Sequence, residues 1–186
     1  MNKLTKISLK ILKESLNIKN SDKVCLVRDH DSKIVSSFEN ALKLLKIKYR
    51  IVKIRLNRAN SSPIPEVNFN NCSIIIAPTK NSITHSPETI KASKKRIKVI
   101  TLPGITEEIF NKILNANFKE IEKLNSKINK QVKNAKEIKI TTKSGTNVSI
   151  KLNNKRDWIK DSFIVPKGKI NNKLGITFST DEVIVP

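Results

Sequence analysis

The chain has few of the residues that mark specialised classes of protein. Its 186 residues include two cysteines, Cys25 and Cys72, too few for a disulfide-rich scaffold or a CxxC metal site. Aromatic residues make up 4%, with one Trp and one Tyr, so no platform for stacking nucleic-acid bases is visible. No apolar run approaches the ~20 residues of a membrane span. We therefore expect no membrane partner, and two cysteines that stay buried thiols in a reducing cytoplasm.

Acidic residues are also scarce relative to basic ones. Lysine and arginine total 37 against 16 acidic residues, a net charge of +21, which makes nucleic acid the first partner to consider. Most basic residues are lysines scattered along the chain, and only residues 91–98 (KASKKRIK) form a dense cluster. With four glycines and abundant Lys, Asn and Ile, this bias is typical of A+T-rich codon usage. We expect a compositional charge excess and no nucleic-acid partner. The alternative is a non-catalytic basic α/β module that binds nucleic acid.

Apolar strand patterns and helical patterns alternate through the first hundred residues. Such an order predicts an α/β fold in which parallel strands are joined by right-handed crossovers, a Rossmann-like sheet. Neither a G-x-G-x-x-G fingerprint nor a Walker sequence is present. The expected strands are 23–27, 49–56, 72–77 and 98–102, with 72–77 in the centre, and the expected helices are 3–17, 34–45 and 86–96.

The pattern changes in the last third of the chain. A helical pattern runs with breaks from Thr106 to about Asn134, and acids at Glu107 and Glu108 suit its first turn. Alternation then resumes on both sides of a turn at 144–147, which predicts a β-hairpin. We expect an amino-terminal α/β domain at 1–136 and the beginning of a second, β-rich α+β domain at 137–186. About 50 residues are few for a β-domain with its own core, so the second domain looks unfinished.

Few residues are obvious candidates for chemistry. His30 follows the first strand and His85 follows the third, and α/β folds place ligands at these carboxyl ends. For each histidine two roles are possible. It is either a structural turn or loop residue that makes hydrogen bonds, or a residue that binds a ligand. A metal site would require the fold to bring them together with carboxylates. Glu107 and Glu108 diverge on a helix, which favours capping over paired catalysis.

Three stretches of the chain together carry a family resemblance. They are residues 77–85 (APTKNSITH), 101–108 (TLPGITEE) and 179–186 (STDEVIVP), and a weaker pattern runs from Gly145 and Thr146 through Arg156, Trp158 and Asp161. The chain resembles the amino-terminal part of the leucyl aminopeptidase (aminopeptidase T) family of metal-dependent exopeptidases. Proteins similar to this family include the ring-cleaving dihydroxypyridine dioxygenases. The resemblance covers nearly all of this chain but only about the first half of a family member.

The resemblance implies a site that this chain does not complete. Glu182 stands where the family has a metal ligand, and the other ligands lie downstream in the family. Ser179 stands where the family usually has Pro, and Thr177 where it usually has Asn. The implied function is hydrolysis of amino-terminal residues from peptides with a divalent metal, zinc or cobalt, that this chain does not hold alone. We expect the chain to be inactive alone, and to form a homodimer or pair with a complementing carboxyl-terminal chain that restores the peptide site.

Overall fold

The computed structural model describes residues 1–152 and the short strand at 177–179. The chain divides into two compact units, which we describe separately. The first comprises Met1–Ala116 and Ile164–Glu182, and the second comprises Asn117–Phe163 and Val183–Pro186. The division follows contacts within the chain, and the domain boundary expected between residues 136 and 137 stays a prediction.

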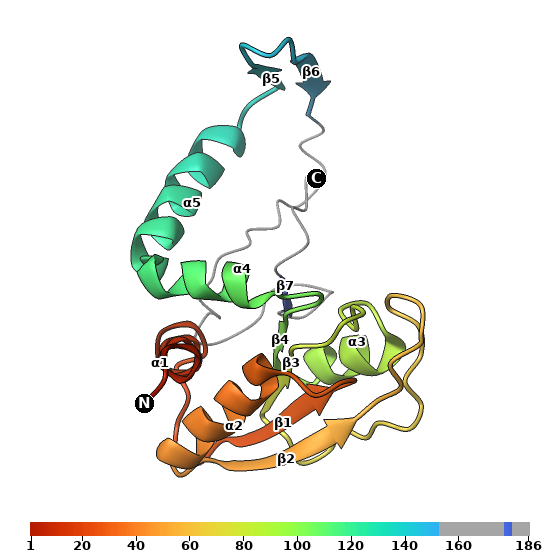
Figure 1. Ribbon diagram of the computed structural model, residues 1–186. Helices are drawn as coiled ribbons and strands as arrows, with labels where there is room; N and C mark the ends of the chain where they lie inside the picture. Colours follow the sequence, from red (N-terminus) through yellow and green to blue (C-terminus); the bar gives the residue numbers. More distant parts are fainter. Residues whose placement is uncertain (153–176, 180–186) are drawn as a thin grey trace. The chain divides into compact units, whose positions relative to one another are not determined.

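The first unit is built on a parallel sheet with the strand order β2-β1-β3-β4-β7 (Figure 1). The central strand β3 is buried along its whole length, as its uninterrupted apolar sequence predicts. The α/β, Rossmann-like fold class is therefore confirmed. The strands are β1 (Lys23–Arg28), β2 (Lys48–Lys53), β3 (Ile74–Ala77), β4 (Lys98–Thr101) and β7 (Thr177–Ser179). Strand β7 falls within residues 137–186, the range expected for the second domain, and it pairs parallel with β4.

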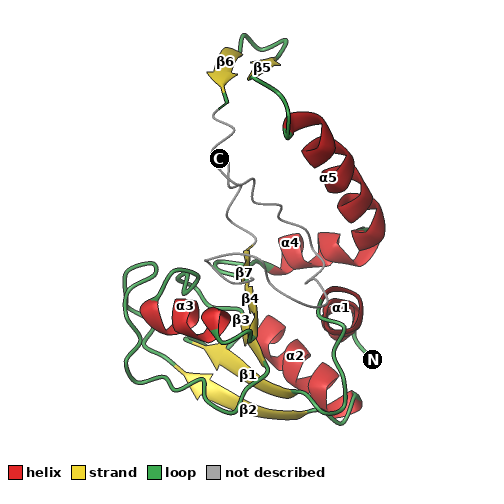
Figure 2. Ribbon diagram, turned by 180° about the vertical axis from the view of Figure 1, so that it is seen from behind, coloured by secondary structure: helices red, strands yellow, loops and turns green. Residues whose placement is uncertain are grey.

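Both faces of the sheet are covered. Alternate residues of a strand point to opposite faces, so Cys25 and Val27 belong to one core and Val24 and Leu26 to the other. The first core also contains Ala92 of α3 (Pro87–Lys94) and apolar residues of the loop after β2. On the other face, α2 (Lys33–Leu44) contacts β1 and packs against α1 (Lys3–Lys10). The two views show α2 beside β1 and β2, and α3 beside β3 and β4 (Figures 1 and 2).

The helices on the α2 side are joined by polar and aromatic contacts. The buried hydroxyls of Ser8 and Ser37 lie 2.7 Å apart between α1 and α2. The rings of Phe38 in α2 and Phe110 in α4 (Glu107–Lys112) meet edge to face, with centroids 5.8 Å apart. A π-helical turn at Ile11–Ser15 follows α1, and a 3-10 turn at Ile113–Asn115 follows α4. These contacts fix α1, α2 and α4 as one layer.

The second unit contains a helix and a hairpin. Helix α5 (Phe118–Val132) begins after Asn117, whose side chain accepts the backbone N–H of Glu120 at 3.3 Å. The expected long helix is thus three segments, because the backbone leaves the helical conformation at Ala116. Strands β5 (Glu137–Thr141) and β6 (Asn147–Lys151) pair antiparallel around the expected turn, which confirms the hairpin.

The expectation that Cys25 and Cys72 are free thiols is wrong for this structure. They form a disulfide with Cα atoms 5.9 Å apart, inside the range that a disulfide can bridge. The reason is the strand order: Cys25 lies in β1 opposite Ile75 of the neighbouring β3, and Cys72 lies just before β3 begins. The sequence shows neither this pairing nor the closeness of the two chain segments.

Candidate functional site

The candidate site lies at the carboxyl edge of the sheet, where the chain changes direction. From β1 the chain crosses to β2 on one side, whereas β3 lies on the other side of β1. Such a switch point is where open α/β sheets place their ligands. The residues after β1 and the loop after β3 flank it, and that loop is the first of the three stretches noted above. The position of the switch point follows from the strand order alone.

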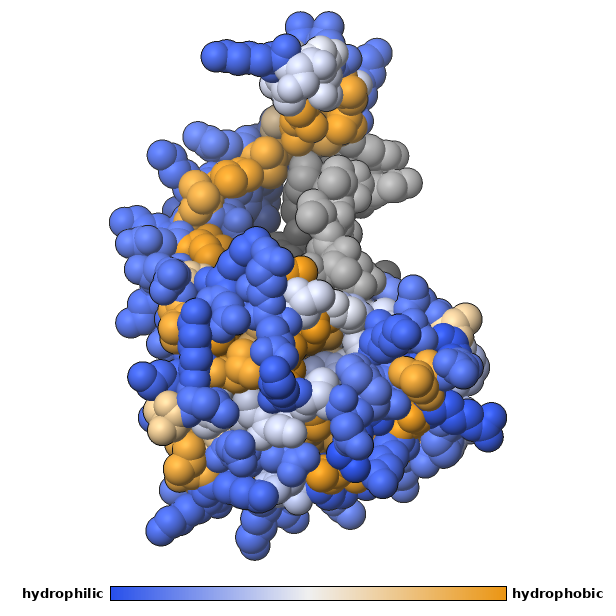
Figure 3. All heavy atoms as spheres, in the orientation of Figure 1, coloured by the Kyte–Doolittle hydropathy of each residue, from blue (hydrophilic) through white to orange (hydrophobic). Residues whose placement is uncertain are grey.

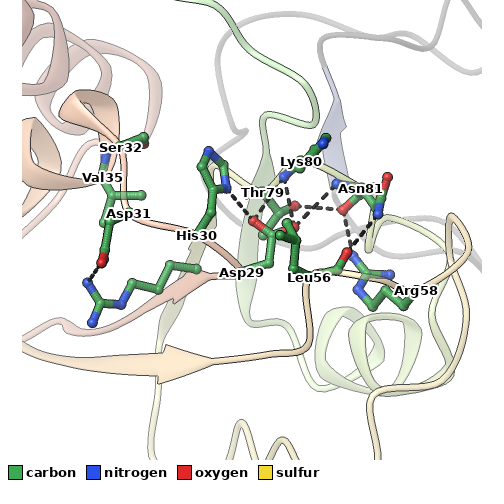
Figure 4. Close-up of polar contacts among 11 residues, drawn as sticks. Asp29, His30, Asp31, Ser32, Val35, Leu56, Arg58, Thr79, Lys80 and Asn81 are labelled. Carbon is green, nitrogen blue, oxygen red and sulfur yellow. Dashed lines mark hydrogen bonds and ion pairs between the residues drawn. The ribbon is translucent and has the colours of Figure 1, made fainter.

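Asp29 is the centre of this edge. Its side chain is 0% exposed, and its carboxylate accepts the backbone N–H groups of Lys80 at 2.9 Å and Asn81 at 3.3 Å (Figure 4). The Nδ1 atom of His30 lies 2.6 Å from the same carboxylate. Since an ionised carboxylate only accepts hydrogen bonds, Nδ1 of a neutral His30 carries the proton and Nε2 is the acceptor. Asp29 therefore ties the end of β1 to the loop after β3.

Arg58 holds the same loop from the other side. Its guanidinium donates to the carbonyl oxygens of Asn81 at 2.5 Å and Ser82 at 2.9 Å (Figure 4). Partial burial lowers the pKa of Arg58, while the charges of Asp29 and Glu66 oppose that shift. Its Nε atom is buried and has no hydrogen-bond partner in the described part of the chain. Arg58 is thus a partly buried cation that supports the loop after β3.

Buried hydroxyl groups join the first two of the motif stretches. Ser82 Oγ donates to Thr84 Oγ1 at 2.9 Å, and Thr84 Oγ1 lies 2.9 Å from Thr101 Oγ1 at the end of β4. A backbone bond from Gly104 N–H to the carbonyl of Thr79, at 2.8 Å, closes the contact. Gly104 has φ of +60°, a conformation that favours glycine. The two stretches therefore form one connected structure at the sheet edge.

The two histidines do not form a common site in the described contacts. His30 bonds Asp29, whereas the backbone N–H of the exposed His85 donates to Ser61 Oγ at 3.3 Å. In residues 1–152, no group of three or more His, Cys, Asp or Glu side chains could hold a metal ion. Glu182, the ligand expected from the resemblance, lies outside the described residues, as do Arg156, Trp158, Asp161 and Asp181. The described residues thus do not fit a complete metal site.

The capping interpretation of the acidic pair is confirmed. Thr106 Oγ1 accepts the backbone N–H of Ile109 at 3.2 Å, and both acids lie in the first turn of α4. Glu107 pairs with Lys33 and Glu108 pairs with Lys112, each at 3.2 Å. These contacts anchor a helix end, and the two carboxylates are engaged with different lysines.

Sequence reasoning missed the two charged residues that organise this edge. Asp29 carries a recognisable signal, since it is the first residue after a buried parallel strand. No sequence signal marks Arg58 as a site residue, because it lies in a polar loop rich in Asn, Ser and Pro. Chemically, the edge is a hydrogen-bonded network in which Arg58 Nε has no partner among the described residues, and the side chain of His30 is 38% exposed. This arrangement orders two loops around the switch point.

Comparison with known proteins supports the fold. No family model and no curated protein matches the chain. Among solved structures, it is similar to the 2,5-dihydroxypyridine dioxygenase of Pseudomonas putida KT2440, with a TM-score of 0.61 and 16% sequence identity. The match covers 82% of this chain and 48% of that enzyme. The chain therefore spans about half the length of the protein it matches, and the likeness shows the fold.

Proposed function

We propose that this chain is the amino-terminal portion of a metal-dependent leucyl aminopeptidase-like protein and is inactive alone. In the completed protein, amino-terminal residues would be hydrolysed from peptides. The proposal comes from the resemblance of residues 77–85, 101–108 and 179–186 to that family. Within the described fold, the first two of these stretches meet through Thr84 and Thr101.

A partial match to a longer protein supports one element of the proposal, that the chain is a portion of a larger whole. The structural match covers 82% of this chain and 48% of the dioxygenase chain. A protein built on the same plan would have a further part of similar size. That part is where we place the remaining metal ligands, with Glu182 as the ligand that this chain contributes.

The chemistry of the carboxyl edge supports a scaffolding role for the first unit. In a ligand-binding α/β domain, polar groups at the switch point are directed at the ligand. Here the carboxylate of Asp29 accepts the backbone N–H groups of Lys80 and Asn81 and contacts His30 Nδ1. The guanidinium of Arg58 donates to carbonyl oxygens of the loop after β3. These groups are therefore committed to the structure of the loops. Peptide hydrolysis is assigned to the completed second domain.

The second unit presents apolar side chains that a completing part would cover. Leu124 is 57% exposed and Ile128 is 46% exposed, and they lie one helical turn apart on α5. In the hairpin, Ile140 and Val148 face each other across the strands and are 45% and 46% exposed. Figure 3 shows an orange row of apolar side chains along α5. We assign this surface to the carboxyl-terminal part of the completed protein, because the chain spans 48% of its structural neighbour.

The proposal includes a cytoplasmic location. Among the described residues, no helix combines the length and the apolar character that crossing a membrane requires. Glutathione and thioredoxin keep most cytoplasmic cysteines reduced, so in that compartment the disulfide between Cys25 and Cys72 would be reduced to a pair of thiols. The redox state of this pair in freshly lysed cells is a direct test of the location.

Co-expression with a completing part tests the function. The DNA after the codon for Pro186, and neighbouring genes, are searched for a frame that encodes further His, Glu and Asp ligands. The two parts are co-purified, and release from a leucyl-anilide substrate is measured with zinc or cobalt. We expect activity from the completed protein and none from the 186-residue chain. Activity of the chain alone would overturn the proposal, and so would a completed protein that consumes oxygen with 2,5-dihydroxypyridine and leaves the peptide analogue intact.

A further inference from the structure

A second feature of the first unit lies at the opposite, amino edge of the sheet. All strands of a parallel sheet begin at the same edge, so the connections that enter them converge there. Basic residues scattered through the sequence are gathered by this geometry. Exposed cations in these connections and strand beginnings are Lys19, Lys23, Lys46, Lys48, Arg50, Lys94, Lys95 and Arg96. The register places Lys23 directly beside Lys48.

Acidic residues are scarce at this edge. In residues 16–23, 45–50, 68–74 and 94–98, the one acidic residue is Asp22, whose carboxylate accepts from Lys19 N–H and Ser73 Oγ at 2.8 Å each. The carboxyl edge is different, because Arg28 there pairs with Asp31 and Lys33 pairs with Glu107. In the described part of the chain, no carboxylate forms an ion pair with the cations of the amino edge. Among the described residues, the positive charge of this edge therefore has no ion-pair partner.

The amino edge is also hollowed. An open hollow of about 410 Å³ is lined by Lys23, Val24, Lys48, Tyr49, Arg50, Asn68, Asn70, Asn71 and Cys72. The Arg50 guanidinium is held by contacts to the carbonyls of Asn68 and Asn70. Lys95 Nζ donates to Asn70 Oδ1 at 3.3 Å, which attaches the 91–98 cluster to the wall of the hollow. Three amide side chains and one phenol thus line the hollow together with Lys23, Lys48 and Arg50.

We propose that the amino edge binds the phosphate backbone of single-stranded nucleic acid. Neighbouring strands lie ~4.8 Å apart, so the row of cations from β2 to β4 extends over about 15 Å, long enough to contact more than one phosphate. The hollow beside Tyr49 offers amide groups for a base or sugar. A strand of RNA or DNA fits these groups better than the anionic surface of a bilayer, because the hollow lined by amide side chains and Tyr49 offers contacts to a base or sugar that lipid headgroups would not use. The inference is independent of the proposed aminopeptidase function.

The proposal changes the interpretation of the net charge. From the sequence, residues 91–98 were the only dense basic cluster, and the other lysines looked dispersed. The fold combines part of that cluster with Lys23, Lys48 and Arg50. Binding through a few phosphate contacts and one aromatic residue is expected to be sequence-blind and strongly dependent on salt.

Fluorescence anisotropy with a labelled 12-nucleotide single-stranded RNA tests the proposal. The double variant Lys23→Gln/Lys48→Gln is compared with Lys127→Gln/Lys130→Gln, which removes the same charge from α5. Affinities are measured between 50 and 200 mM salt. We expect the edge variant to bind about tenfold more weakly near 100 mM salt, with a salt slope shallower by about 1.4, since each single-strand phosphate contact contributes ~0.7. The α5 variant should change affinity less than twofold, and circular dichroism checks that both variants fold.

Three results would overturn the proposal. Equal weakening in both variants would mean diffuse attraction to total charge. Absence of RNA binding by the unaltered chain at 50 mM salt would remove the site altogether. Binding to phosphatidylserine vesicles that is tighter than RNA binding and lost in the edge variant would assign the surface to a membrane. None of these outcomes depends on peptidase activity, so the two proposals fail separately.

Discussion

Replacing Asp29 should destabilise the chain more than replacing any other carboxylate near the switch point. Its side chain is 0% exposed and serves two backbone N–H groups and the His30 ring. A hydrogen bond to a charged group contributes about 1.5–3 kcal/mol, and a donor left buried without a partner costs about 1–3 kcal/mol. Because Lys80 is exposed, its backbone N–H can form a hydrogen bond with water in the variant, so the free energies of the lost hydrogen bonds do not add up fully. We expect Asp29→Ala to lower the free energy of unfolding by about 3 kcal/mol.

Two further variants separate the carboxylate from its neighbours. Asp29→Asn keeps one carbonyl oxygen as an acceptor but directs an NH₂ group at N–H donors, and should cost about 1–2 kcal/mol. Asp31→Ala is the matched control, since this carboxylate is 86% exposed and its pair with Arg28 lies at the surface. Such pairs contribute up to about 1 kcal/mol.

Urea unfolding followed by circular dichroism measures all three variants. A loss of 3 kcal/mol is a large part of the 5–15 kcal/mol typical of a domain, so the transition midpoint should shift clearly. Equal stability of Asp29→Ala and the unaltered chain would refute the reasoning. A larger loss of stability in Asp31→Ala than in Asp29→Ala would refute it as well, because the exposure of a carboxylate would then not predict the free energy of unfolding lost on its replacement.

Three smaller perturbations test other contacts by the same unfolding measurement. Thr84→Val removes a buried hydroxyl that bonds Ser82 and Thr101, and should cost about 1–3 kcal/mol; no loss would contradict the network. Gly104→Ala should cost about 1 kcal/mol from its φ of +60° alone, since an added Cβ meets only Lys80 O at 3.8 Å, and a larger loss would indicate a clash. Cys72→Ser should lose about 2–4 kcal/mol under oxidising conditions, and reductant should lower the unaltered chain to the same level; a reductant-insensitive chain would contradict the disulfide.

The fold was accessible from the sequence because its signals are local. Apolar β-branched runs such as 72–77 and 98–102 differ clearly from the helical spacing of Ile34, Val35 and Phe38. The order of these segments then restricts the topology to a parallel sheet with crossovers. The hairpin was equally accessible, since its alternation and its Gly145 turn are adjacent in the chain.

The site was accessible only in part because its contacts are not local. The sequence indicates that the residues after β1 and β3 share an edge, but it does not show that Asp29 reaches 51 positions ahead to Lys80. Neither does it show that Arg58 folds back onto Asn81, or that Cys25 meets Cys72. Each of these contacts depends on the lateral order of the strands and on loop paths that no local pattern encodes.

The metal content of the completed protein tests the central claim most directly. Elemental analysis is carried out on the co-purified parts, on the same protein with Glu182→Gln, and on the matched control Asp181→Asn. The account predicts that the completed protein retains zinc or cobalt through gel filtration, that Glu182→Gln loses most of it, and that Asp181→Asn keeps it. Full retention of metal by Glu182→Gln, or stoichiometric metal on the 186-residue chain alone, would contradict the claim that this chain is one half of a shared metal site.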